Sequence, residues 1–404
     1  MRKPASHTGT SRTGSPAEVF GASLKLGLTS FGGPIAHLGY FERLYVRERR
    51  WLSDDEYAGL VALCQFLPGP TSSQVGFLIG LRRAGWPGAL AAWLGFTLPS
   101  ALLMYAFAVL TPQLHGTLMH AVLHGLMLTA VAVVAQAVWS MARSLCPDRE
   151  RAAIAVLAAA VLLIQSNGLM QLAALVGGAI AGAVLCRKLA PQSPDLPPVL
   201  DRRLAWIALT LFSGLLIALP VAAVFVPHGL IALTSVFYRA GALVFGGGHV
   251  VLPLLHESLV PNGLLSDDTF LAGYGFAQGL PGPLFSLAAY LGAASAPAHA
   301  SLPWAALALF AIFLPGLLLA VAALPLWTRI AHIKTAQAML AGVNAAVVGV
   351  LGAALYNPVW ISAVRNGFDV AIVIAAFALL LRWRVPPILV VALCVATSIA
   401  TAAA

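Results

Sequence analysis

Charged residues are scarce in this sequence. Lys, Arg, Asp and Glu together make up 9% of the 404 residues, whereas hydrophobic residues make up 60%. A soluble domain carries about 25% charged residues. The composition therefore excludes a water-soluble fold and places most of the chain in a lipid bilayer.

The sequence also lacks the alternation of polar and apolar residues that a membrane β-barrel requires. Its apolar stretches are instead long and continuous, as in 118–141, 204–226 and 304–326. A helix needs about 20 such residues to cross a bilayer, and only helices and closed barrels satisfy their backbone groups there. We therefore predict an all-α polytopic membrane protein.

Signatures of disulfides, metal sites and cofactors are missing. The cysteines lie far apart without paired spacing, at Cys64, Cys146, Cys186 and Cys394. His120 and His124 share one helix face, but no third ligand follows at a suitable spacing, which favours a hydrogen bond between helices over a metal site. No catalytic carboxylate is visible either. The sequence thus predicts no metal, no cofactor and no enzyme activity.

Acidic residues are absent from the interior of the apolar stretches. Coupling to protons would therefore have to use histidine, or Glu42 and Glu257 near segment ends. The basic residues give a net charge of +9, but they lie in short clusters between the apolar stretches. Such clusters mark cytoplasmic loops and do not form a nucleic-acid stripe, so we predict no nucleic-acid binding.

Three motifs recur at one long period. Phe31-Gly32-Gly33 recurs as Phe245-Gly246-Gly247, and Leu52-Ser53-Asp54-Asp55 recurs as Leu265-Ser266-Asp267-Asp268. Gln65-Phe66-Leu67-Pro68-Gly69-Pro70 recurs as Gln278-Gly279-Leu280-Pro281-Gly282-Pro283. Self-similarity of this kind indicates two homologous halves.

The repeat sets the expected organisation. We predict a disordered cytoplasmic tail at 1–16, a first repeat at 17–189, a cytoplasmic linker at 190–203, an extra transmembrane helix at 204–226 and a second repeat at 227–404. Because one unpaired crossing separates the halves, the second half should be inserted upside down relative to the first. Inverted halves of this kind are common in secondary transporters.

Glycine and proline interrupt two apolar segments in each half. About 14 residues precede Gly32 in the first of these, or about 21 Å of helix, whereas the bilayer core is about 30 Å thick. We therefore favour re-entrant hairpins, which place the Arg43, Arg47, Arg49 and Arg50 cluster on the cytoplasmic side. Full crossings are the alternative, and they would place this cluster outside.

The motifs resemble the chromate ion transporter family, two-domain long-chain type. The resemblance rests on Phe31-Gly32-Gly33-Pro34 with His37, on Trp51-Leu52, on Leu63 to Pro70, and on Phe245 to His249 and Gln278 to Pro283 in the second half. It implies a multi-pass protein of the bacterial inner membrane that exports chromate, confers chromate resistance and uses the proton-motive force. Sulfate would be a competing mimic, and whether the protein forms a homodimer is left open.

The breaks are the predicted substrate site. A half-helix that begins after a break presents backbone N–H groups and a positive dipole end, which suit a tetrahedral dianion. The candidates are the glycines Gly32, Gly33, Gly69, Gly246, Gly247 and Gly282, the hydroxyls of Thr71, Ser72, Ser73 and Ser286, the amides of Gln65 and Gln278, and the imidazoles of His37 and His249. The alternative is that the glycines only permit close helix packing.

Lys25 and Arg239 are a further candidate pair. Each lies six residues before a Phe-Gly-Gly motif, so each half places one cation at an equivalent depth. A charge inside an apolar segment is costly and is a functional candidate for that reason. Alternatively, these long side chains reach back to the membrane interface.

Other functions remain open on the sequence alone. The same fold would serve a transporter for uptake or exchange of sulfate or another oxyanion, and a passive anion channel is a third possibility. The change in cellular chromium separates export from uptake. Collapse of the membrane potential and the proton gradient separates a driven transporter from a channel.

Overall fold

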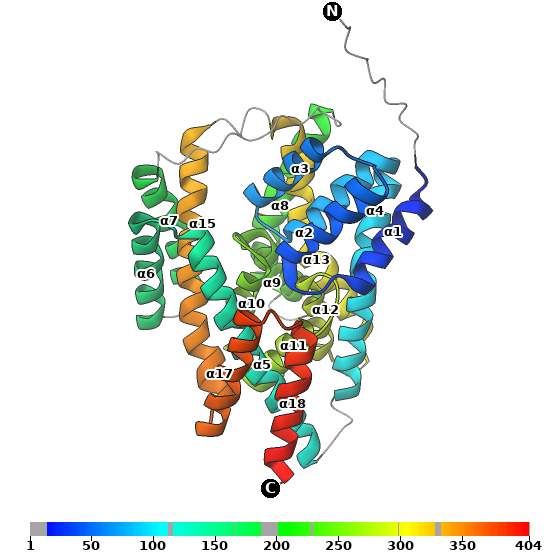
Figure 1. Ribbon diagram of the computed structural model, residues 1–404. Coiled ribbons are helices and arrows are strands. Elements are labelled where there is room, and N and C mark those ends of the chain that lie inside the picture. Colours follow the sequence, from blue (N-terminus) through cyan, green and yellow to red (C-terminus); the bar gives the residue numbers. More distant parts are fainter. Residues whose placement is uncertain are drawn as a thin grey trace, which may run out of the picture.

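The structure is a computed structural model that describes residues 14–111, 116–165, 167–186, 201–226, 229–297, 299–327 and 333–403. All regular elements within these residues are helices (Figure 1). Residues 1–13 of the predicted tail and 187–200 around the predicted linker lie outside the described residues. The predicted fold class is confirmed.

The helices of the second half follow one another in a similar order to those of the first half. The first half contains α1 (Pro16–Thr29), α2 (Gly33–Phe41), the π-helix η1 (Glu42–Glu48), α3 (Asp54–Phe66), α4 (Thr71–Leu110), α5 (Thr117–Leu145), α6 (Arg149–Ile164) and α7 (Gly168–Leu185). The helix without a counterpart is α8 (Arg202–Phe225). The second half begins with α9 (Leu230–Leu243), η3 (Gly248–Val250), α10 (Val251–Leu259), α11 (Asp267–Gln278), η4 (Leu284–Ser286) and α12 (Leu287–Ala294). It ends with α13 (Ser301–Ala323), η5 (Leu324–Leu326), α15 (Lys334–Ala354), η6 (Leu355–Trp360), α16 (Ile361–Ala363), α17 (Gly367–Arg382) and α18 (Pro387–Ala403).

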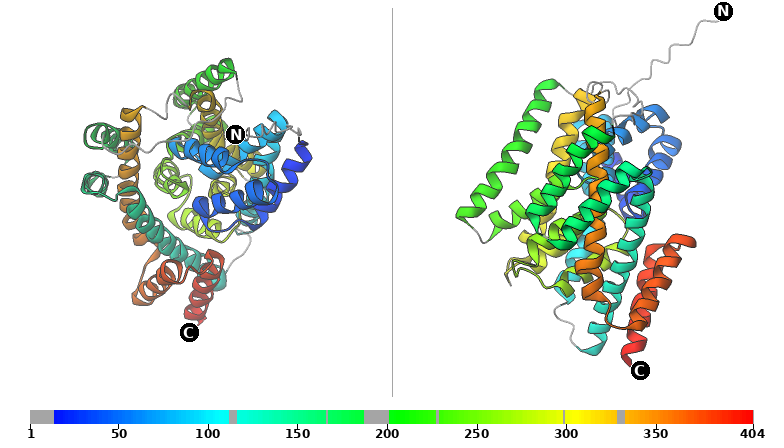
Figure 2. Two further views of the ribbon diagram at one scale, coloured as in Figure 1. Left: turned by 45° about the horizontal axis from the view of Figure 1, so that its top comes forward. Right: turned by 90° about the vertical axis from the view of Figure 1, so that its left-hand side faces the viewer.

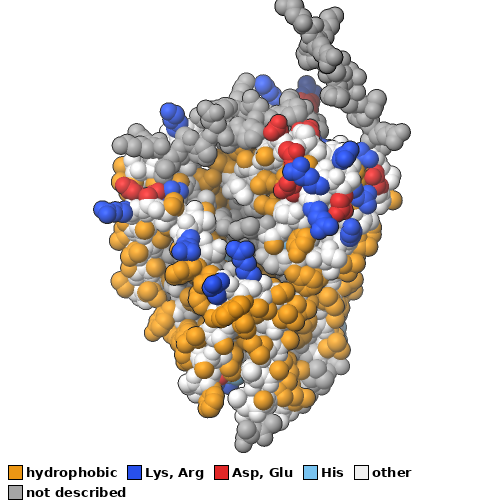
Figure 3. Space-filling view, viewed as in Figure 1, with side chains coloured by type: hydrophobic (Ala, Val, Ile, Leu, Met, Phe, Trp, Pro, Cys, Tyr) orange, Lys and Arg blue, Asp and Glu red, His pale blue; other side chains and the backbone are white. Residues whose placement is uncertain are grey.

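Helices of spanning length are present in both halves. Among the described residues, six helical segments are long and apolar enough to cross a bilayer: 71–110, 117–145, 168–185, 202–225, 301–326 and 334–363. An apolar band covers most of the face seen in Figure 3, and charged side chains gather toward one end of it. The protein is therefore a multi-pass membrane protein.

The two halves are inverted and interlocked. α4 and α13 run in opposite directions, as do α5 and α15 (Figures 1 and 2). α6 and α7 of the first half pack on α15 of the second, while α17 and α18 of the second half pack on α5 of the first. Glycines allow these close contacts, because a Cβ at Gly182 would overlap the Ala338 carbonyl oxygen.

The first break turns the chain back on itself. The hydroxyls of Ser23 in α1 and Tyr45 in η1 lie 2.9 Å apart, so η1 returns alongside α1. Arg82, near the end of the first part of α4, likewise lies 2.5 Å from Glu56 in the first turn of α3. α4 then bends at Ala84 and Gly85 before its long second part begins. Both broken segments of the first half are therefore hairpins.

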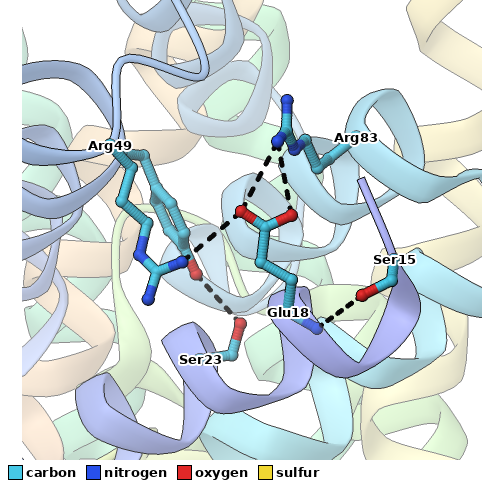
Figure 4. A network of polar contacts seen from close by, with 6 residues as sticks. Ser15, Glu18, Ser23, Arg49 and Arg83 are labelled. Carbon is cyan, nitrogen blue, oxygen red and sulfur yellow. Dashed lines mark hydrogen bonds and ion pairs between the residues drawn. The ribbon is translucent and has the colours of Figure 1, made fainter. Parts of the chain in front are cut away.

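A polar network joins the open ends of these two hairpins. Glu18 of α1 lies between Arg49, which follows η1, and Arg83, which ends the first part of α4, at 3.6 and 3.3 Å (Figure 4). Both guanidinium groups also lie against the ring of Trp51, at 5.3 and 5.1 Å from its centroid. The hairpins thus enter and leave at the same face, which confirms the prediction of re-entrant helices.

The second half repeats this arrangement. The Tyr290 hydroxyl of α12 donates to the Thr269 carbonyl at the start of α11, at 3.0 Å. His256, near the end of α10, contacts Asp267 at the start of α11 at 2.6 Å. These contacts hold the open ends of the second pair of hairpins together.

Candidate functional site

The four helix breaks meet across the boundary between the halves. We call 30–33 and 244–247 the Phe-Gly-Gly breaks, and 67–70 and 279–283 the Pro-Gly-Pro breaks. The N–H of Gly69 donates to the carbonyl of Val244 at 2.7 Å, and the N–H of Gly282 donates to the carbonyl of Ser30 at 2.9 Å. Each Pro-Gly-Pro break is therefore hydrogen-bonded to the Phe-Gly-Gly break of the opposite half.

The glycines of the Pro-Gly-Pro breaks are packed against helix backbone and side chains. A Cβ at Gly69 would lie 2.9 Å from Gly316 Cα in α13. A Cβ at Gly282 would lie 2.9 Å from Ser100 Oγ and 3.2 Å from the Phe96 carbonyl oxygen in α4. Close packing accounts for these two glycines.

The glycines of the Phe-Gly-Gly breaks have space beside them. A Cβ at Gly33 or Gly247 would meet no atom within 4 Å, and one at Gly32 would meet only Ala36 Cβ at 3.2 Å. Gly246 is also exposed, although its Cβ would lie 3.3 to 3.4 Å from side-chain ends of α5 and α15. All four have positive φ, which keeps the chain turned away from a continuous helix. These breaks leave room for a ligand.

Helices that begin at the breaks are not capped by side chains. The N-cap residues of α2, α4, η3 and η4 are Gly32, Pro70, Gly247 and Pro283, and none accepts a cap hydrogen bond through its side chain. By contrast, α1, α3 and α11 enter the hairpins from outside and are capped by Ser15, Ser53 and Ser266. α9 enters after Gly229 without such a cap. No side chain therefore caps the first N–H groups after these breaks, and uncapped groups of this kind are the ones that bind anions at helix N-termini.

Two histidines support the breaks. His37 of α2 is buried, and its Nδ1 lies 3.3 Å from the Ser72 hydroxyl in the first turn of α4. His249 of η3 uses Nδ1 to contact the Tyr274 hydroxyl of α11 at 2.7 Å. Each imidazole therefore links the helix after a Phe-Gly-Gly break to the neighbouring hairpin of its own half.

Several buried polar atoms near the breaks lack a protein partner. Among the described residues, they include Ser30 Oγ, Ser73 Oγ, Gln74 Oε1, Thr97 Oγ1 and Gln278 Nε2. An unmet buried polar group costs about 1 to 3 kcal/mol, so such groups call for a ligand or water. The sequence predicted two members of this set, Gln278 and Ser73. Gln74 was missed, although it ends the polar run Thr71-Ser72-Ser73-Gln74 inside an apolar segment.

Gln74 ties the first Pro-Gly-Pro break to α13 of the other half. Its Nε2 donates to the carbonyls of Pro68 and Gly316, both at 2.9 Å. The position in the second half that follows Ser286 as Gln74 follows Ser73 is Leu287. The site is therefore asymmetric.

Three other predicted site residues lie outside the Phe-Gly-Gly breaks. The Ser286 hydroxyl donates to the Pro283 carbonyl at 2.8 Å and so serves the break itself. Thr71 is half-buried at the start of α4, and Gln65 is exposed on α3. No group of three or more His, Cys, Asp or Glu side chains in the described part of the chain is placed to hold a metal ion.

The two predicted cations point toward the open ends of their hairpins. Lys25 is exposed, and its Nζ lies 3.7 Å from the Glu48 carboxylate at the end of η1. Arg239 is exposed and donates to the Ser258 hydroxyl near the end of α10 at 3.4 Å. It also borders a cavity of about 410 Å³, together with Glu257 and Asn262. Neither cation reaches the breaks.

Comparison with known proteins places both halves in one family. A family model described as "Chromate transporter" matches residues 17–183 and 231–399, once for each half. These boundaries leave out the region between the halves, including α8.

Curated relatives match over most of their own length. A "Chromate transport protein" of Pseudomonas aeruginosa is 29% identical over 384 residues, covering 91% of this chain and 87% of that protein. A "Probable chromate transport protein" of Synechococcus elongatus is 30% identical over 341 residues, covering 82% and 81%. A "Chromate transport protein" of Cupriavidus metallidurans is 28% identical over 368 residues, covering 89% and 86%. No solved structure matches the chain.

Proposed function

This chain belongs to the chromate transporter family, and we propose that it exports chromate across the bacterial inner membrane and thereby confers chromate resistance. The proposal includes the proton-motive force as the energy source. It also includes the orientation given by the positive-inside rule, with the Arg43 to Arg50 cluster in the cytoplasm.

The arrangement of the Phe-Gly-Gly breaks is the observation that carries the proposal. Space beside Gly33 and Gly247, uncapped helix N-termini and unpartnered buried hydroxyls occur together where the halves meet. Every oxygen of a tetrahedral dianion accepts hydrogen bonds, and helix N-termini supply N–H donors with a favourable dipole. Chromate fits this set of donors, and so does sulfate.

Inversion of the halves supports alternating access. The breaks are tied to each other by one hydrogen bond in each direction, so both halves contribute to one shared site. In transporters with inverted repeats, such rocking opens the site to either side in turn. Lys25 and Arg239 lie on the approaches from the two faces. We assign them the role of raising the local concentration of the anion.

The decisive experiment is transport by the full chain. Cells that express it should hold less chromium than cells without it, and inside-out vesicles should accumulate chromate when a proton gradient is imposed. Sulfate in excess should reduce this uptake. A rise in cellular chromium would instead support the rival function, uptake or exchange of sulfate or another oxyanion.

A further inference from the structure

A buried imidazole and a buried carboxylate join the two halves away from the breaks. His124 Nε2 of α5 lies 2.9 Å from Asp369 Oδ1 in the first turn of α17. The side chains are 14% and 6% exposed. Sequence analysis expected His124 to make a helix-interface hydrogen bond but did not identify Asp369, because an acidic residue in a first turn is typical of an ordinary helix start.

The contacts of this pair leave one ring nitrogen unused. Asp369 Oδ2 accepts from the backbone N–H of Arg365 at 2.8 Å, so both carboxylate oxygens have a donor. Since a carboxylate can only accept, His124 carries its hydrogen on Nε2, and Nδ1 presents a lone pair. Nδ1 is buried without a hydrogen-bond partner among the described residues. The pair therefore contains a basic atom on which a proton can be bound.

Other titratable and charged groups lie on the helices around the pair. α17 packs against α5 and α18, and α5 also packs against α11, α15 and η6. On α5, His120 lies one turn before His124 and is exposed, and Arg143 lies in the last turn. Arg365, whose backbone N–H donates to Asp369, is exposed just before α17, and Arg382 lies in the last turn of α17. The remaining groups are the buried thiol of Cys394 on α18, Asp267, Asp268 and Tyr274 on α11, Lys334 at the start of α15 and Tyr356 in η6. The ion pairs of the described residues include no second partner for either member.

Close packing connects the pair to a break. Gly275 of α11 lies against the α5 backbone at Leu126, two residues after His124, so closely that a Cβ would overlap the Leu126 carbonyl. α11 then ends at Gln278, beside the second Pro-Gly-Pro break. A shift of α5 at His124 must therefore displace α11, because packed interiors transmit small movements.

We propose that His124 and Asp369 form the proton-binding site that couples the proton gradient to transport, an inference that rests on the proposed function. The proton adds to His124 Nδ1, the imidazolium keeps its Nε2–H hydrogen bond to Asp369, and the net charge of the pair rises from −1 to 0. α5 and α17 both begin at the end of the molecule opposite α1 and α3 (Figure 1). In the proposed orientation that end faces outward, so a proton enters as chromate leaves.

The test uses the full-length protein in proteoliposomes with two assays. Counterflow measures exchange of labelled for unlabelled chromate at equal pH on both sides. Gradient-driven uptake measures net accumulation after a pH jump. The variants are His124→Gln and Asp369→Asn, each of which removes a titrating group and keeps a hydrogen-bonding side chain. The matched controls are His120→Gln on the same helix and Asp148→Asn, which alters the N-cap of α6.

Both variants should retain counterflow and lose gradient-driven accumulation, whereas the controls should retain both. Variants that still accumulate chromate in response to the pH jump would overturn the inference. So would variants that lose counterflow and accumulation to the same extent, because the pair would then be only a structural tie.

If a single variant is not recovered from the membrane, the double variant with both substitutions takes its place. Its two amides can hydrogen-bond to each other. Retained counterflow with lost accumulation supports the proton site, and retained accumulation or an equal loss of both contradicts it. The parent protein separates the two proposals. If the parent shows no chromate counterflow, the proposed function is wrong. If the parent shows counterflow but a pH gradient does not drive accumulation, only the proposed proton site is wrong.

Discussion

The two kinds of helix break use glycine for opposite purposes. In the Pro-Gly-Pro breaks, Gly69 and Gly282 are glycine because another helix occupies the space of a side chain. In the Phe-Gly-Gly breaks, Gly33 and Gly247 share the positive φ of Gly69 and Gly282 but have nothing within reach of a Cβ. The same residue type thus serves packing at one break and open space at its hydrogen-bonded neighbour.

This difference separates stability from transport. A packing glycine fixes how the halves meet, so its replacement should damage the fold. A glycine beside open space places little demand on packing, so its replacement should damage whatever uses that space. The predictions below test this division.

The largest effect is expected at Gly69. Gly69→Ala brings a Cβ to within 2.9 Å of the Gly316 backbone, which cannot rotate away. Overpacking costs about 1 to 3 kcal/mol, and a strained φ of +117° adds to this. We expect a marked loss of folded protein from the membrane and a lower melting temperature in detergent. Gly177→Ala is the control, because Gly177 is helical with no atom within 4 Å of a Cβ.

Gly282→Ala should be milder than Gly69→Ala, since its nearest neighbour is the Ser100 hydroxyl, which can move. Equal and small losses at Gly69, Gly282 and Gly177 would show that the Pro-Gly-Pro breaks are not packed as described.

The second largest effect is expected at Gly33 and Gly247, where substitution should reduce transport and lower stability only modestly. Gly33→Ala and Gly247→Ala should insert and fold, at a strain cost of about 1 to 3 kcal/mol for a non-glycine residue at positive φ. The new methyl groups should obstruct the anion, so chromate counterflow should fall well below that of the parent. Gly263→Ala is matched for strain, because Gly263 has a φ of +71° and open space but lies in a loop.

The comparison between these variants is decisive for the site. If Gly263→Ala reduces counterflow as much as Gly33→Ala does, backbone strain explains the loss and the open space has no role in binding.

A smaller effect is expected from the unpartnered hydroxyls. Ser30→Ala and Ser73→Ala remove buried atoms that bond to nothing in the described chain, so stability should be unchanged or slightly raised. Loss of a hydrogen bond to a charged ligand costs about 1.5 to 3 kcal/mol, so the KM for chromate should rise by roughly tenfold or more. Ser286→Ala should show the reverse pattern, a lower melting temperature with little change in KM, because its hydroxyl bonds to Pro283.

The smallest effect is expected at the cations. Lys25→Gln and Arg239→Gln remove exposed charges that contact Glu48 and Ser258 rather than the breaks. Exposed charges contribute about 0 to 1 kcal/mol, so the KM should rise only a few-fold, and the difference from the parent should shrink as salt is added. Complete loss of transport at all salt concentrations would place the cations in the binding site itself.

Local chemistry made much of the fold predictable. Glycine and proline close together weaken a helix, so the breaks at Gly32 and Pro68 could be located from sequence, and the repeat of both motifs predicted two halves. Ser53 and Glu56 form a capping box at the start of α3, as a Ser followed three residues later by Glu favours. Inverted topology followed from the single unpaired helix between the halves.

Contacts between distant segments could not be predicted in the same way. Whether a glycine is packed depends on what the other half brings to it, as Gly316 is brought to Gly69. The direction of a long side chain depends on a partner such as Glu48, which lies on another element. Asp369 becomes notable only when α17 is placed against α5.

The hydrogen bonds between breaks also impose an order on synthesis. The N–H of Gly69 has its acceptor on Val244, which the ribosome adds only after the whole first half and α8. Until then the first pair of hairpins is in the membrane with exposed peptide groups that lipid cannot satisfy. The nascent first half must therefore be sheltered by the insertion machinery, and a chain that terminates after α7 leaves an unfinished hairpin pair rather than half a transporter.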